Sequence, residues 1–168
     1  AACDATPQRT IEETPVNLTQ ACNVLAAWDR RFNSESRGAV LFREWITQYP
    51  ADETSLGSSL FQQPFNPMEA ATTPAGLANT DLALDRLARA VLLLEGEDIG
   101  LDTALGNLQI GHRSDRQYPV HGGNRHEGIA NLQMSTSVGN NPTETPIFTG
   151  SDEFAGSSNS LSKSGYNV

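Results

Sequence analysis

The sequence predicts a protein that is mainly α-helical over its first 100 residues and is built from extended segments, short strands and coil after them. Before Gly100, apolar residues recur repeatedly at steps of three and four, the period of an α-helix with one buried face. After Gly100, Gly, Asn, Ser and Thr become frequent and the helical period is lost. We therefore expect an extended lead-in over residues 1–16, a helical lobe over 17–100, and an extended segment with short strands over 101–168.

The first helix is predicted to follow the polar lead-in, which contains Pro7 and Pro15 and so favours an extended chain. Asn17 is the expected N-cap, with Gln20 three residues later, and the helix is expected to end at Asn33–Ser34. The apolar stripe at helical spacing consists of Leu18, Cys22, Leu25, Trp28 and Phe32. This stripe indicates one buried face.

A second helix is predicted from about Ser36 to Tyr49, where Pro50 stops it. It is apolar around much of its girth, through Val40, Leu41, Phe42, Trp45 and Ile46. Residues 51–77 are rich in Pro, Ser, Thr and Gly, which is typical of a long ordered connection. The side chains expected to anchor this connection back onto the helices are those of Leu60, Phe61 and Phe65.

The third helix has the clearest signals in the chain, with Thr80 or Asn79 as its cap and Gly96 at its end. Its predicted inner face consists of Leu84, Leu87, Ala88, Val91 and Leu94. Short strands are expected at 108–110 and 129–132. Residues 156–165 have the composition of a linker, so we expect this tail to pack against a larger body.

The charge of the chain argues against two classes of partner. It has 20 acidic and 11 basic side chains and a formal net charge of −9, which repels nucleic-acid phosphates and anionic lipid. The longest apolar run, 90–94, is far shorter than the roughly 20 residues of a membrane-spanning helix. We expect neither a nucleic-acid nor a membrane partner, and we expect that any export signal was removed or lay on a longer precursor.

The histidines raise the question of a metal site. His126–Glu127 begins like the zinc motif H-E-x-x-H, but the second histidine of that motif is missing. His112, His121 and His126 could form a three-histidine site in principle. Histidines in a segment rich in Gly and Asn are more often hydrogen-bonding turn residues. We therefore predict neither a metal nor another cofactor.

The stretch HGGNRHEG at 121–128 is instead predicted to be a structural turn. Gly122 and Gly123 supply the backbone freedom of a tight turn that leads into the strand expected at 129–132. His121 and His126 are expected to hydrogen-bond across it. Two glycines are too few for a phosphate-binding loop.

Motifs for nucleophilic catalysis are absent from the sequence. No serine lies in a G-x-S-x-G elbow, and the first residue is Ala1, whereas an N-terminal nucleophile requires Ser, Thr or Cys. The acidic pairs Glu12–Glu13 and Asp152–Glu153 are expected to be surface charge, because adjacent side chains of an extended chain point to opposite faces. The formal glycosylation sequon at 17–19 is better explained by helix capping. The sequence contains no complete active site.

The two cysteines, Cys3 and Cys22, leave two alternatives open. They could form a disulfide, which would stabilise the fold by about 3 kcal/mol through the unfolded chain and would imply export. They could instead be two unpaired thiols, with Cys22 buried on the first helix.

Several stretches together resemble a known family: ACNVLAAWDRRFNSESRGAVLFREW at 21–45, ALDRLARAVLLL at 83–94, ALGNLQIGHRSDRQYPVHGGNRHEGIANLQMS at 104–135 and the closing GYNV. Their order and spacing resemble the helix pair, the next long helix, the W-G-D-L-Q segment with its Pro-Gly-Gly turn, and a strand entry in the large subunit of the penicillin acylase family. The nearest branch holds acyl-homoserine-lactone and aculeacin A acylases. Leu105, Asn107 and His121 depart from the family's usual Trp, Asp and Pro.

The resemblance implies an N-terminal nucleophile hydrolase with an αββα sandwich. In that family a precursor cleaves itself, the freed serine attacks an amide, and backbone and side-chain donors hold the oxyanion. Those residues precede the matched region, so no catalytic residue is carried over to this chain. The resemblance therefore implies a fragment of the large subunit that is inactive alone, with the small subunit and the N-terminal part of the large subunit of the same precursor as its partners.

The family also implies hydrolysis of N-acyl compounds such as acyl-homoserine lactones, penicillins or lipopeptides, with roles in antibiotic metabolism or quorum quenching. Members are commonly exported, so the resemblance implies a periplasmic or extracellular protein and favours the disulfide between Cys3 and Cys22. The alternative hypothesis is a free-standing, exported, non-catalytic binding or interaction domain whose helices form the whole core.

Overall fold

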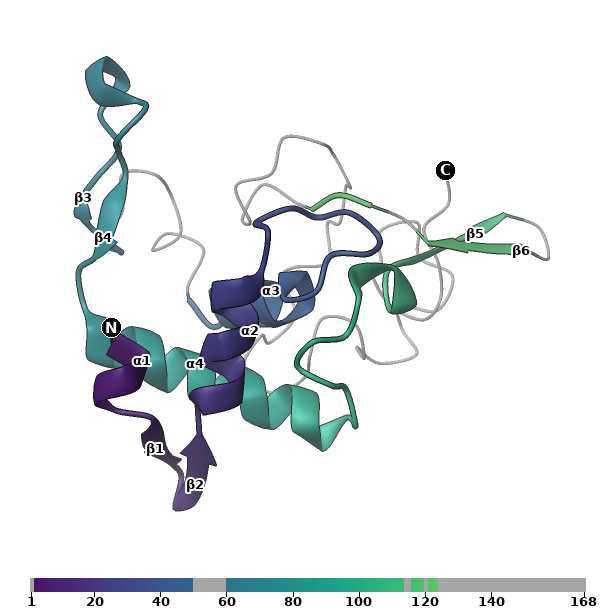
Figure 1. The fold of residues 1–168 in the computed structure, drawn as a ribbon, viewed down its shortest axis with the longest axis horizontal. Coiled ribbons are helices and arrows are strands. Elements are labelled where there is room, and N and C mark those ends of the chain that lie inside the picture. The colour runs from purple at the N-terminus through teal and green to yellow at the C-terminus, as the bar shows by residue number, and fades with distance from the viewer. Residues whose placement is uncertain (1, 50–59, 114–115, 120, 124–168) are drawn as a thin grey trace.

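The computed structural model describes residues 2–49, 60–113, 116–119 and 121–123, and this part of the chain has an α+β fold (Figure 1). The described elements are, in chain order, α1 (Ala2–Ala5), β1 (Gln8–Ile11), β2 (Thr14–Asn17), α2 (Thr19–Ala27), α3 (Ala39–Thr47), β3 (Phe61–Gln63), the 3-10 helix η1 (Pro67–Glu69), β4 (Ala75–Leu77), α4 (Thr80–Gly96), the 3-10 helix η2 (Leu105–Asn107), β5 (Ile110–Arg113) and β6 (Arg116–Pro119). The strands pair as antiparallel hairpins, β1–β2, β3–β4 and β5–β6. None of the described helices is both long and apolar enough to cross a membrane.

Helix α4 runs across the lower left of the view in Figure 1, below α3, and it matches its prediction closely. Asn79 caps it, since its Oδ1 accepts a hydrogen bond of 2.9 Å from the backbone N–H of Leu82. The helix ends at Gly96. The five predicted inner-face residues are all buried: Leu84, Leu87, Ala88, Val91 and Leu94. The capping residue, the apolar stripe and the terminal glycine are local sequence signals, and all three agree with the structure of α4.

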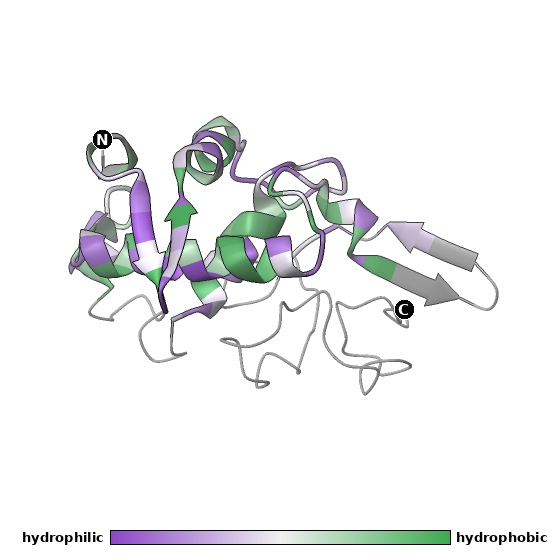
Figure 2. Cartoon of the chain, turned by 90° about the horizontal axis from the view of Figure 1, so that it is seen from below, coloured by the Kyte–Doolittle hydropathy of each residue, from purple (hydrophilic) through white to green (hydrophobic). Residues whose placement is uncertain are grey.

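The hydrophobic core lies between α4, α3, α2 and the β1–β2 hairpin. Along the helices, hydrophobic residues alternate with hydrophilic ones, as expected for helices with one buried face (Figure 2). The fully buried apolar side chains include Leu18, Ala39, Val40, Leu41, Leu94 and Leu105. This core holds together segments from residue 11 to residue 105.

Helix α2 is shorter than predicted, because it ends at Ala27 rather than at Asn33–Ser34. Trp28 leaves the helix with an extended backbone, and its indole Nε1 donates to the carbonyl of Arg31 at 2.9 Å. Phe32 is buried, as its spacing suggested, but it reaches the core from a loop and packs edge-on against Trp28 at 5.4 Å between ring centroids. A turn can return an aromatic side chain to the same face as a helix would, so spacing alone could not tell the two apart.

The predicted N-cap of α2 is also displaced by one residue. Leu18 occupies the cap position and makes no side-chain cap bond, while Asn17 is the last residue of β2. Asn17 still serves the helix start, since its Oδ1 accepts a hydrogen bond of 2.9 Å from the N–H of Thr19. Asn17 therefore satisfies a donor at the helix start from within the preceding strand.

Helix α3 spans Ala39–Thr47, which is shorter than the predicted 36–49. Its start is set by Gly38, which has a φ of 96°. A Cβ at Gly38 would lie 2.7 Å from the Cβ of Trp28, so only glycine fits between the α2–α3 loop and the helix. Before it, Arg37 pairs with Ala104 in an isolated β-bridge. The helix is buried on most sides, as predicted.

The lead-in over residues 1–16 is more structured than expected. It contains the helical turn α1 and the β1–β2 hairpin, whose turn is formed by Glu12 and Glu13 at φ values of 48° and 71°. Two successive residues with positive φ make the kind of turn that usually carries Asn-Gly. The hairpin was missed because glutamates stand where the sequence signal of such a turn is expected.

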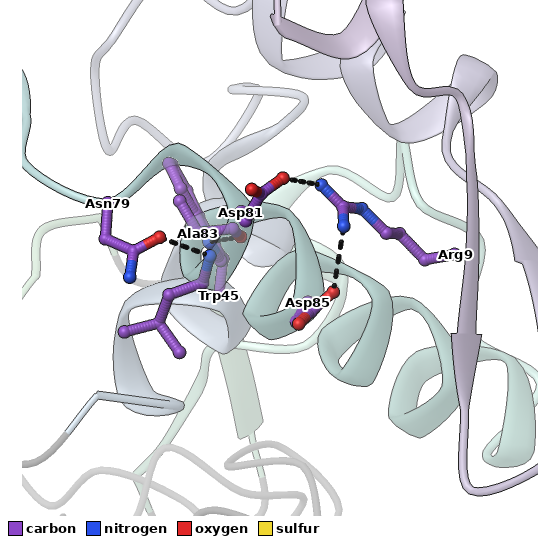
Figure 3. A network of polar contacts seen from close by, with 7 residues as sticks. Arg9, Trp45, Asn79, Asp81, Ala83 and Asp85 are labelled. Atoms are coloured by element: carbon purple, nitrogen blue, oxygen red, sulfur yellow. Dashed lines mark hydrogen bonds and ion pairs between the residues drawn. The ribbon is translucent and has the colours of Figure 1, made fainter.

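Polar contacts join the N-terminal hairpin and α3 to the first turns of α4 (Figure 3). The guanidinium of Arg9 in β1 lies 2.7 Å from the carboxylate of Asp81 and 3.5 Å from that of Asp85. From α3, the indole Nε1 of Trp45 donates to the carbonyl of Ala83 at 2.9 Å. These contacts orient the hairpin and α3 on the same helix.

The predicted connection over 51–77 contains a hairpin instead of a segment packed along the helices. Strands β3 and β4 pair at Phe61–Leu77 and Gln63–Ala75, and the hairpin projects from the helical body (Figure 1). Leu60 and Phe61 are half-buried, but Phe65 is exposed, so its predicted anchoring role is wrong. Residues 50–59, including Pro50, lie outside the described part of the chain.

Beyond Gly100 the described chain consists of turns, η2 and the β5–β6 hairpin, and its described residues form no α-helix. The strand expected at 108–110 begins only at Ile110, because Leu108 and Gln109 close the turn after η2 with hydrogen bonds to the carbonyl of Leu105. The strand expected at 129–132 and the linker-like tail at 156–165 lie outside the described residues.

Candidate functional site

The candidate site of this chain is a buried polar cluster centred on Arg43, which projects from α3 and is 0% exposed. Its Nη1 donates to the Oε1 of Gln109 at 2.7 Å, and its Nη2 donates to the carbonyl of Gly122 at 3.2 Å. The guanidinium carbon also lies 5.3 Å from the ring centroid of Phe32. We call Arg43, Gln109, Gly122 and Phe32 the Arg43 cluster.

Gly122 is held from three sides within this cluster. Its carbonyl accepts from Arg43 and also from the Nε2 of Gln109 at 3.0 Å, and its N–H donates to the carbonyl of Phe32 at 2.6 Å. Its φ is 102°, a conformation that side-chain-bearing residues rarely adopt. The backbone of the 121–123 turn is therefore positioned by buried donors and by glycine's conformational freedom.

The Arg43 cluster joins the two ends of the third hairpin. Gln109 immediately precedes β5, and Gly122 follows β6 by a few residues, so a single guanidinium reaches both. Because the cluster is buried, each bond acts in a low local dielectric and its loss would leave a polar group without water. Each hydrogen bond between the charged guanidinium and a neutral buried acceptor contributes about 1.5–3 kcal/mol. The cluster is suited to positioning the chain rather than to acid–base chemistry.

A second polar region lies at the surface in the α2–α3 loop, where a depression of about 250 Å³ opens to solvent. It is lined by Ala27, Asp29, Asn33, Glu35, Ser36 and Arg37. Asp29 accepts from the N–H of Arg31 at 2.9 Å and from the Oγ of Ser36 at 3.3 Å. A hydrogen bond from the Oγ of Ser34 lowers the pKa of the Glu35 carboxyl, with a smaller contribution from a backbone hydrogen bond. The carboxylates of Asp29 and Glu35 thus accept hydrogen bonds from other residues of the α2–α3 loop.

The predicted disulfide residues are brought together by the fold. Cys3 in α1 and Cys22 in α2 are joined by a disulfide, with their Cα atoms 6.1 Å apart. The bridge closes a loop that contains the whole β1–β2 hairpin. It therefore ties α1 and the hairpin to the first long helix of the core.

The three histidines, unlike the two cysteines, are not shown to come together. His121 is exposed, while the neighbouring Gly122 and Gly123 are buried. His112 lies in β5, and His126 lies outside the described residues, so the contact predicted between His121 and His126 stays a prediction, as does the metal-site question. Within the described part of the chain, no group of three His, Cys, Asp or Glu side chains could hold a metal ion.

The acidic pairs also have defined places. Glu12 and Glu13 form the β1–β2 turn, and the carboxylate of Glu12 is 2.9 Å from the guanidinium of Arg89 on α4. Both side chains are exposed, as expected for surface charge. Asp152–Glu153 lies outside the described residues.

Comparison with known proteins gives this arrangement a context. The sequence profile of the penicillin amidase family matches residues 2–160. The chain belongs to the penicillin amidase family. The match covers α1 to β6, and with them the Arg43 cluster and the three hairpins. The family assignment read from the motifs at 21–45, 83–94 and 104–135 is therefore confirmed.

Named relatives within this family are acylases. The chain is 30% identical over 117 residues to aculeacin-A acylase of Actinoplanes utahensis, covering 70% of this chain and 14% of that protein. It is 32% identical over 126 residues to the acyl-homoserine lactone acylase PvdQ of Pseudomonas syringae pv. tomato, covering 71% of this chain and 16% of the relative. The chain is also 30% identical over 123 residues to the PvdQ acylase of Pseudomonas fluorescens, and the match covers 70% of this chain and 15% of that protein. The chain thus corresponds to about one sixth or less of these relatives.

The Arg43 cluster was missed by sequence reasoning, although one signal pointed to it. Arg43–Glu44 interrupts the apolar run of α3, and both side chains are 0% exposed. Charged residues are rarely fully buried without partners. A charged pair inside a helix expected to be apolar all round therefore indicates a buried polar cluster, but its partners Gln109 and Gly122 could not be inferred from the spacing.

Proposed function

We propose that this chain is part of the large subunit of an N-terminal nucleophile acylase that hydrolyses the amide of N-acyl compounds, such as acyl-homoserine lactones, penicillins or lipopeptides. The observation that carries the proposal is the family profile match over residues 2–160. The names of the relatives, aculeacin-A acylase and acyl-homoserine lactone acylase, support the substrate class.

The contribution of this chain to that enzyme is structural. Its buried polar side chains Arg43 and Gln109 are engaged in bonds that position the 121–123 turn. We therefore expect the 168-residue chain to be inactive alone, to pack on the αββα sandwich of the parent enzyme, and to have the rest of the precursor as its partner. The alternative of a free-standing binding domain is not favoured, since the family match extends over most of the chain.

We further propose that the parent enzyme is exported to the periplasm or the extracellular space. The disulfide between Cys3 and Cys22 supports this location, because such bonds persist in oxidising compartments. Alkylation of free thiols before and after reduction, in protein taken from cells and from the periplasm, tests it. Recovery of the enzyme only from the cytoplasmic fraction, with Cys3 and Cys22 as free thiols, would contradict the proposal.

The function is tested by producing the protein encoded by the whole reading frame and, separately, the 168-residue chain. Each is incubated with an N-acyl homoserine lactone, a penicillin and an acylated lipopeptide, and the released amine is measured. We expect turnover of at least one substrate by the whole protein and none by the chain alone. Turnover by the chain alone would exclude the fragment proposal, and a whole protein inactive on all three substrates would exclude this substrate class.

A further inference from the structure

Exposed apolar side chains gather at one place in the described structure, the β3–β4 tip (residues 64–74). Phe65 is 37% exposed and Met68 is 88% exposed, and the other large apolar side chain exposed among the described residues is Tyr118 of β6. Figure 1 shows the tip at the far end of a hairpin that stands away from the helices. Single exposed apolar residues are ordinary, but two on one projecting tip indicate an interaction surface.

The tip is shaped by its own hydrogen bonds. The Oγ1 of Thr73 accepts from the N–H of Asn66 at 2.9 Å and lies 3.0 Å from the carbonyl of Glu69, to which it donates. The side chain of Asn66 accepts from the N–H of Met68 at 3.0 Å and caps η1. Phe65 and Met68 are thus presented by a preformed turn, which lowers the entropy lost on binding.

The hairpin is poor in charge although the protein is strongly acidic. Between Leu60 and Ala78, Glu69 is the one charged residue, in a chain with a net charge of −9. Interface cores are depleted of charged residues and enriched in Met and aromatic residues. A two-stranded hairpin is also marginal in water unless a face of it is covered. Composition and architecture both favour a protein surface as the partner.

We propose that the β3–β4 tip is a docking element that inserts Phe65 and Met68 into an apolar pocket on the remainder of the same acylase polypeptide. This inference rests on the proposed function, in which the chain is part of a larger enzyme. The matched segments make up only 14% and 16% of aculeacin-A acylase and of PvdQ, so most of such an enzyme lies outside this chain and can supply the pocket. The tip lies within residues 2–160, over which the family profile matches the chain.

Oxidation of Met68 measures whether the tip is covered. The 168-residue chain and the protein encoded by the whole reading frame are treated with hydrogen peroxide, and conversion of Met68 to the sulfoxide is followed by mass spectrometry. We expect oxidation to be at least about tenfold slower in the whole protein, because covered residues react only after local opening. Both proteins unfolded in guanidinium serve as the reference for full exposure. Equal rates in the two folded proteins would overturn the proposal.

Substitutions test the contribution of the contact. In the isolated chain, Met68→Asp should leave the melting temperature unchanged, since the side chain is 88% exposed. In the whole protein it should lower the yield of assembled enzyme by about tenfold or more, because it buries an unpaired carboxylate. Met68→Leu should assemble normally, and Glu69→Gln on the same tip is the matched control. Normal assembly of the Met68→Asp protein would contradict the proposal.

Three outcomes separate this inference from the alternatives. If the isolated chain sediments as a dimer that Met68→Asp converts to a monomer, a second copy covers the tip and the proposal is wrong. If the whole protein hydrolyses an acyl amide while Met68 stays fully oxidisable, the proposed function holds and the docking proposal fails. Slow oxidation in a whole protein without amidase activity would support the docking and exclude the function.

Discussion

The β1–β2 and β3–β4 hairpins are both built from short strands but have opposite relations to the core. Ile11 and Val16 of the first hairpin are buried against the helices, at 7% and 4% exposure. In β3 and β4 no residue is fully buried, and the tip carries the exposed Met68. A hairpin is stable where one face packs on another layer. The comparison shows that the first hairpin finds that layer within this chain, whereas the second carries Phe65 and Met68 exposed at its tip.

The third hairpin, β5–β6, sharpens the comparison, because it is held at its base by the Arg43 cluster. Replacing Arg43 with alanine removes its two charge-assisted hydrogen bonds to Gln109 and Gly122 and should cost about 3–5 kcal/mol of unfolding free energy. Urea unfolding measures the loss. Arg37→Ala is the matched control: this arginine side chain is 65% exposed, so the loss should be below about 0.5 kcal/mol. Equal losses in the two variants would show that the Arg43 cluster does not hold the hairpin.

The disulfide is a second difference between the first two hairpins. The Cys3–Cys22 loop encloses β1–β2 and leaves β3–β4 outside it. Replacing both cysteines with alanine should cost about 3 kcal/mol, mainly by freeing the unfolded chain. Amide exchange should rise in β1 and β2 and stay unchanged in β3 and β4. A uniform rise over both hairpins would contradict the separation.

The burial of apolar side chains is a third difference between the β1–β2 and β3–β4 hairpins. Ile11→Ala removes core contacts of the first hairpin and should cost about 2–3 kcal/mol, as measured by thermal unfolding. Phe65→Ala removes a ring from the exposed tip and should cost less than about 0.5 kcal/mol in the isolated chain. A large loss from Phe65→Ala would mean that the tip is packed within this chain, and it would refute the contrast between the hairpins.

The turn of the first hairpin should allow a gain. Glu13 has a φ of 71°, where glycine is more favourable, so Glu13→Gly should stabilise the chain by about 0.5–1 kcal/mol. Glu13→Ala removes the same charge but keeps a Cβ, and should bring no gain. If both variants are equally stabilised, charge repulsion rather than backbone conformation is the cause.

The ion pairs of the first hairpin should have the smallest effect. Arg9 bridges to Asp81 and Asp85, whose side chains are 83% and 47% exposed, so solvent screens both pairs. Arg9→Met, which keeps most of the apolar stem, should cost less than about 1 kcal/mol. The difference from the unmodified chain should shrink further in about 1 M sodium chloride. A loss that is independent of salt would point to packing of the stem instead.

Helices could be predicted from the sequence where their signals are local. The cap at Asn79, the inner face of α4 and the stop at Gly96 all come from neighbouring residues and matched the structure. The end of α2 was wrong because Phe32 kept the helical spacing after the helix had ended at Ala27. The β1–β2 turn was missed because Glu12–Glu13 lacks the usual turn residues.

The family and helix α4 were thus determined by the sequence itself, because motif order and helical period are properties of the chain. The tertiary structure alone decided the candidate site. Arg43 bonds to Gln109 and Gly122, which are 66 and 79 residues away in the chain. Helical hydrogen bonds join residues four positions apart, so a helix with one buried face shows a periodic pattern of apolar residues in the sequence. Contacts between residues so far apart in the chain depend instead on how the core packs. Only that packing placed a buried arginine beneath the 121–123 turn and left Met68 exposed on a projecting hairpin.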